Sequence, residues 1–109
     1  MPNPSYLYAR THEPRHVAIR HLLDSIADVA SVTETRTFSG LLLMMKLELS
    51  KSALHELPER LGAIHVPLEP PSVELVHELE TKGPETVDVV LDVQFVDGNP
   101  DVRDEIPPG

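Results

Sequence analysis

Two histidines four residues apart, His12 and His16, mark the segment of this chain most suggestive of chemistry. With Glu13 between them they match the H-E-x-x-H pattern, in which two histidines on one helical turn hold zinc and the glutamate is a general base. Pro14 disfavours this geometry, because a helix that begins near Glu13 leaves His12 outside it. The sequence therefore argues against a zinc protease and keeps a simpler metal site at His12 and His16 as a hypothesis.

Several other classes of catalytic site are missing from the sequence. The chain has no cysteine, which excludes disulfides, thiol catalysis and cysteine-ligated metals. It has five glycines and neither a glycine-rich phosphate loop nor the serine elbow of hydrolases. We therefore expect no cofactor, and an enzyme is less well supported than a binding protein.

Negative charge is concentrated in the last third of the chain. The 109 residues include 18 acidic and 9 basic side chains, for a formal net charge of −9. Ten of the acidic residues but only two of the basic ones follow residue 72, which leaves the first 72 residues nearly neutral. This charge disfavours binding to nucleic-acid phosphates or anionic lipid and favours a basic protein partner.

Alternating apolar and polar residues predict a β-hairpin in the acidic segment. Residues 73–80 and 87–96 each alternate, and the turn sequence 81–84 separates them. One face of this hairpin is apolar and the other is acidic. We expect the acidic face to bind the partner through four carboxylates: Glu78, Glu80, Asp88 and Asp92.

The rest of the chain predicts alternating strands and helices. Apolar residues at helical spacing predict an amphipathic helix over 13–29. Ser50 caps a second helix, which ends at Gly62 and which Pro58 is expected to break in two. Short strands are expected at 5–9, 32–38, 41–49 and 63–66.

This order of elements predicts the fold class. It is the βαββαβ order of a ferredoxin-like α+β sandwich, with the hairpin as a C-terminal addition. The strand over 32–38 carries threonines on one face and is only half apolar on the other, which is typical of a sheet edge. We expect one α+β domain over 1–97 and a flexible, disordered acidic tail over 98–109, which is rich in proline and aspartate.

An apolar sheet face without helices is a further expectation. Helices cover one face of such a sheet, yet the strand over 41–49 is apolar on both faces in its first half. Either the hairpin or a second subunit must then cover the open face, and we expect a homodimer. We assign to this dimer or cavity face Tyr6, Tyr8, Leu42, Met44 and His77.

The sequence best fits a non-enzymatic binding or regulatory module. It would bind a protein through the acidic hairpin and the exposed edge strand 32–38. The alternatives are a small dimeric α+β-barrel enzyme with a cavity on the open sheet face, and a metal-handling protein that uses His12 and His16. The longest apolar run, 41–45, is too short to span a membrane and the start lacks a signal peptide, so we expect a cytoplasmic protein.

Overall fold

The computed structural model describes residues 4–38 and 41–96 of the chain. Within them it contains, in sequence order, β1 (Ser5–Thr11), α1 (Arg15–Ile26), β2 (Ala30–Phe38), β3 (Leu42–Ser50), α2 (Lys51–Ala63), α3 (Pro70–Lys82) and β4 (Thr86–Phe95). The turn expected at Ser39-Gly40 and the tail expected over 98–109 lie outside the described residues. None of the described helices is long and apolar enough to cross a membrane.

The strands form a mixed sheet in the order β1-β4-β3-β2. β1 pairs in parallel with β4, and the other two neighbouring pairs are antiparallel. The chain is therefore α+β, and β2 lies at an edge as its mixed pattern predicted. The ferredoxin-like strand order is wrong, because β4 lies between β1 and β3. β4 suits a central position, since consecutive residues Val89, Val90 and Leu91 are all buried.

The predicted C-terminal hairpin is wrong in its first half. Residues 73–80, expected as a strand, belong to α3. Two signals favour the helix. Pro70 and Pro71 occupy its first turn, where proline fits best, and Ser72 and Val76 are buried at a spacing of four. The second half was predicted correctly, because β4 buries alternate side chains from Val87 to Phe95.

The segment around α2 also differs from the prediction. Pro58 lies inside a continuous helix, which is held by buried leucines on either side of it at Leu57 and Leu61. The strand expected over 63–66 is the end of α2 and the turn after it. A single bridge between Ala9 and Leu68 is the extent of β-pairing in this region.

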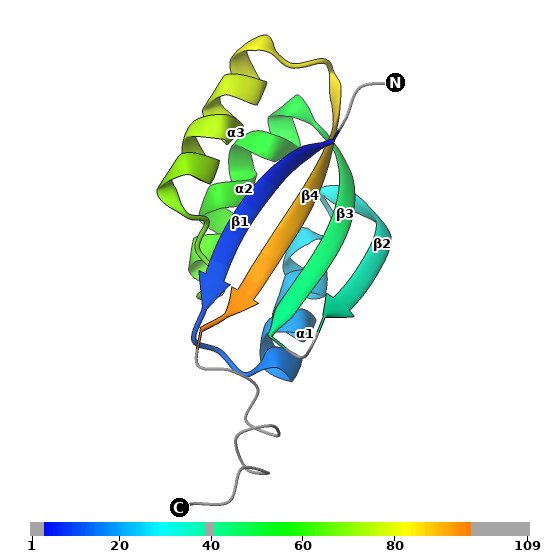
Figure 1. The fold of residues 1–109 in the computed structure, drawn as a ribbon. Helices are drawn as coiled ribbons and strands as arrows, with labels where there is room; N and C mark the ends of the chain where they lie inside the picture. Colours follow the sequence, from blue (N-terminus) through cyan, green and yellow to red (C-terminus); the bar gives the residue numbers. More distant parts are fainter. Residues whose placement is uncertain (1–3, 39–40, 97–109) are drawn as a thin grey trace, which may run out of the picture.

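The hydrophobic core lies between one face of the sheet and the three described helices (Figure 1). Leu7, Leu43 and Leu91 enter it from the sheet, while Leu22 and Leu54 enter it from α1 and α2. In Figure 1 the described helices all lie behind the sheet, so the face toward the viewer has no helix on it. The fold therefore leaves an open sheet face among the described residues, as the sequence predicted.

Candidate functional site

Three rows of side chains cross the open sheet face from β1 to β2. Residues directly opposite each other on paired strands project from the same face, so the strand register defines each row. From β1 through β4 and β3 to β2, the rows are Tyr6–Val90–Lys46–Glu34, Tyr8–Asp92–Met44–Arg36 and Arg10–Gln94–Leu42–Phe38. The sheet thus places four of the five residues assigned to this face together: Tyr6, Tyr8, Leu42 and Met44.

Most of the aromatic side chains of this protein stand on the open face. The chain has two tyrosines, two phenylalanines and no tryptophan. Tyr6, Tyr8 and Phe38 are 48%, 48% and 44% exposed on this face, while Phe95 is buried in the core. Aromatic residues are normally buried in a core or an interface, because they carry a large apolar surface. Their placement here makes the open face the candidate site among the described residues.

Asp92 lies in the middle row between Tyr8 and Met44. It is half-buried, and burial raises the pKa of its carboxyl above the ordinary value for aspartate. Among the described residues no hydrogen bond or ion pair reaches this carboxylate. A partly desolvated carboxylate between Tyr8 and Met44 is stabilised by any group that brings it a cation or a hydrogen-bond donor.

Positive charge on the open face gathers over β2 and β3. Glu34 pairs with Arg36 on the same strand and with Lys46 on β3, where the Nζ–Oε1 distance is 3.6 Å. Two cations therefore share one carboxylate. Strand spacing of about 4.8 Å separates the backbones of Arg36 and Asp92 by about 10 Å, and among the described residues Arg36 pairs with Glu34 rather than with Asp92.

The four carboxylates expected on one acidic face do not share one. Glu78 and Glu80 belong to α3 on the helix side, while Asp88 and Asp92 project from the open side of β4. Glu80 accepts a hydrogen bond from His55 of α2, with an Nδ1–Oε2 distance of 3.1 Å. Glu80 thereby joins two helices, and a partner-binding role for the four as a set loses its geometric basis.

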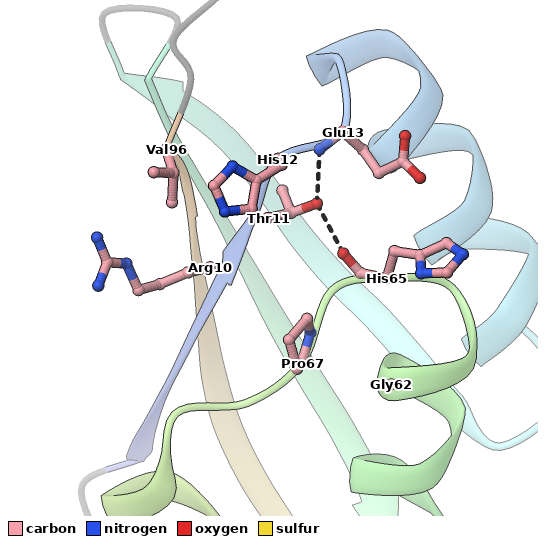
Figure 2. Close-up of a pocket in the computed structure, with 8 residues that line it drawn as sticks. All are labelled: Arg10, Thr11, His12, Glu13, Gly62, His65, Pro67 and Val96. Carbon is pink, nitrogen blue, oxygen red and sulfur yellow. Dashed lines mark hydrogen bonds between the residues drawn. The ribbon is translucent and has the colours of Figure 1, made fainter.

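The three histidines that the sequence analysis selected do not lie together in the structure. His12 lies in the connection between β1 and α1, His16 lies in the first turn of α1, and His77 lies exposed on α3, away from the open face. Among residues 4–38 and 41–96, no three histidine or acidic side chains gather closely enough to hold a metal ion. His12 instead lines a surface pocket with His65, a residue that the sequence analysis did not select (Figure 2).

The sequence analysis expected the edge strand 32–38 to bind a partner but did not assign its side chains to the open face. Glu34, Arg36 and Phe38 project from the open side of β2, and arginine and phenylalanine are both common in interfaces. A signal existed in the alternation of 32–38, but a register irregularity between Val32 and Glu34 changes which residues face the helices. Comparison with family models, with curated proteins and with solved structures finds no match to the chain.

Proposed function

We propose that this protein is a non-enzymatic binding module that associates with a second copy of itself through the open sheet face. The observation that carries the proposal is the exposure of Tyr6, Tyr8 and Phe38 on a face that none of the described helices covers. Burial of such side chains stabilises a complex in proportion to the apolar area removed from water. The partner therefore has an apolar and aromatic surface of similar size.

Complementarity between the two halves of the face favours a second copy. Two sheets that stack face to face keep their strands within about 30° of each other. We place a two-fold axis parallel to the strands, above the line between β3 and β4 at the middle of the sheet. Rotation about this axis brings β1 of one copy over β2 of the second copy. In that arrangement Tyr8 meets Arg36 of the second copy within the middle row, and Arg10 meets Phe38 within the next. Each of these contacts is a cation–π pair and occurs twice by symmetry.

The available area indicates how tight the association is. Four strands spaced about 4.8 Å apart, with about eight residues each at about 3.3 Å, offer about 500 Å² of flat area per copy. The total of about 1,000 Å² lies at the lower limit of specific interfaces. We therefore expect a dimer that dissociates on dilution rather than an obligate one.

A small-substrate enzyme on the same face is less well supported. The depression that the structure forms there, lined by Tyr8, Leu42 and Asp92 among others, holds about 260 Å³. Pockets for small molecules usually enclose about 300–1,000 Å³. The shallow depression fits a side chain of a protein partner better than a substrate.

Sedimentation of the full chain over a range of concentrations tests the proposal. We expect the unmodified protein to shift from monomer to dimer, and Met44→Glu to remain monomeric at every concentration. Phe38→Glu is a second variant for the same purpose, since this exposed residue can change without disturbing the core. Leu23→Glu is the matched control, because Leu23 is 41% exposed on α1, away from the sheet.

Two results would overturn the proposal. One is an unmodified protein that stays monomeric across the whole range. The other is a dimer that Phe38→Glu and folded Met44→Glu leave intact while Leu23→Glu disrupts it, because that dimer would use the helix side.

A further inference from the structure

A surface pocket outside the open face lies where β1 and β4 end. Its volume is about 730 Å³, within the range of small-molecule sites. β1 and β4 are parallel neighbours, so their carboxyl ends open at the same edge of the sheet, where α/β proteins commonly bind ligands. The lining residues are Arg10, Thr11, His12, Glu13, Gly62, His65, Pro67 and Val96 (Figure 2).

Thr11 joins the two chain segments that form the pocket. Its side chain is buried, and its hydroxyl donates to the backbone carbonyl of His65 at 2.8 Å. The same oxygen accepts a hydrogen bond from the backbone N–H of Glu13 at 3.0 Å. Figure 2 shows both bonds at the centre of the pocket. One buried threonine thus fixes the segment before α1 against the segment after α2, and it gives the pocket defined walls.

His65 occupies a backbone position that favours glycine. Its φ is 64°, in the left-handed region, and no other described residue apart from glycine has a positive φ. It follows the C-cap of α2 in a Schellman motif, in which Val66 N–H donates to the Leu61 carbonyl and His65 N–H donates to that of Gly62. A histidine with this φ destabilises the folded state, and backbone strain of this kind is commonly found at functional sites.

Opposite charges stand on opposite walls of the pocket. In Figure 2 the Arg10 guanidinium lies to the left and the Glu13 carboxylate to the right, beside the His65 ring. Arg10 also approaches Glu69, but the distance of 3.7 Å is long and the arginine side chain is 53% exposed, so its donors stay accessible. Pro67 and Val96 add apolar surface to the lining.

We propose that this pocket binds a short zwitterionic peptide. Its carboxylate pairs with Arg10, and its ammonium group pairs with Glu13 beside His65. Arginine suits a carboxylate because its planar fork of donors matches the two oxygens. The pocket lies at the end of the sheet, but Arg10 also faces Phe38 of the second copy in the proposed dimer, so the ligand is titrated at concentrations below dimer formation.

Three probes built on the same tripeptide distinguish the contributions of the two ligand charges to affinity. Triglycine carries both, N-acetyltriglycine lacks the ammonium group and triglycinamide lacks the carboxylate. Titration of the full chain with each probe, followed by the NMR signals of the Thr11 and His65 amides, gives three affinities. We expect triglycine to bind about three- to fivefold more tightly than either blocked probe, as each pair is partly exposed to solvent.

Variants that remove one charge from the pocket show which residue pairs with which end of the ligand. Arg10→Gln should abolish the preference for triglycine over triglycinamide and leave the preference over the acetylated probe. Glu13→Gln should have the reverse effect, and His65→Gly should weaken all three probes while the protein stays folded. Equal affinity of the three probes for the unmodified protein, or no shift at the Thr11 and His65 amides, would overturn the proposal.

Discussion

The backbone N–H of Tyr8 donates a hydrogen bond to the Ser72 hydroxyl at 2.7 Å, across 64 residues of sequence. The segment between α2 and α3 continues this contact along β1. Arg10 N–H donates to the Pro67 carbonyl at 3.3 Å, and Glu69 N–H donates to the Tyr8 carbonyl at 2.8 Å. One edge of the sheet is therefore protected by this segment, and unpaired strand edges are sites of unwanted association. In the described structure β2, at the other edge, has no comparable cover.

Replacement of Ser72 by alanine should destabilise the protein by about 1–3 kcal/mol, because it leaves the Tyr8 N–H buried without an acceptor. Ser72 is 3% exposed, so water cannot readily replace its hydroxyl. Urea denaturation measures the free energy of unfolding. Ser31→Ala on exposed β2 is the control and should change it by less than about 0.5 kcal/mol. A change at Ser72 no larger than at Ser31 would contradict this account of the β1 edge.

Asp92→Asn should stabilise the free monomer at neutral pH. Burial raises the pKa of Asp92, so the folded state penalises its ionised form and the unfolded state does not. The penalty is present above the raised pKa and disappears as the pH falls through it. The stability advantage of Asp92→Asn should therefore shrink toward acid pH. Denaturation at several pH values, at concentrations below dimer formation, measures the difference.

Asp88→Asn is the matched control for Asp92. Asp88 is exposed on the open side of the same strand, so its replacement should alter stability little at any pH. A constant difference between Asp92→Asn and the unmodified protein across the pH range would show that desolvation of the carboxylate is not its origin.

The sequence predicted which side chains project from the open face of the sheet better than it predicted the order of the strands. The alternation of β3 identified Leu42 and Met44 as residues of an uncovered face, because side-chain direction in a strand depends only on position. Strand order depends on which strands are buried on both sides and on how the helices cross over. Val90, which is buried on the open side, was the local sign that β4 lies in the centre.

Residues 73–80 show why one segment was assigned to the wrong element. Val73, Leu75 and Leu79 fit an alternating strand, while Val73 and Val76 also fit a helix. Pro70 and Pro71 decide between the two, because proline in the first turn starts a helix and proline is rarely accommodated in a sheet. The pocket was missed because it unites Thr11 and His65, and no local pattern records contacts between residues so far apart.

His55 and Glu80 should make the contact between α2 and α3 sensitive to pH. The hydrogen bond and the charge of Glu80 raise the pKa of His55 above its ordinary value. The pairing therefore contributes fully below about pH 6.5, the value for unfolded histidine, and is lost as the pH rises through the raised pKa. NMR titration of the His55 ring should show a lower pKa in Glu80→Gln. Glu78→Gln, on the same helix, should change it less, and equal changes would contradict a specific pair.

His65→Gly should raise the free energy of unfolding, although most replacements by glycine lower it. A non-glycine residue in the left-handed region costs about 1–2 kcal/mol, and the added freedom of glycine in the unfolded chain costs about 0.5–1 kcal/mol. The difference predicts a net gain of about 0.5–1 kcal/mol, measurable by urea denaturation. His65→Ala separates conformation from chemistry, because alanine removes the imidazole but keeps the unfavourable φ. It should bring no comparable gain, whereas equal gains from glycine and alanine would show that the imidazole itself, and not the backbone angle, is the source of strain.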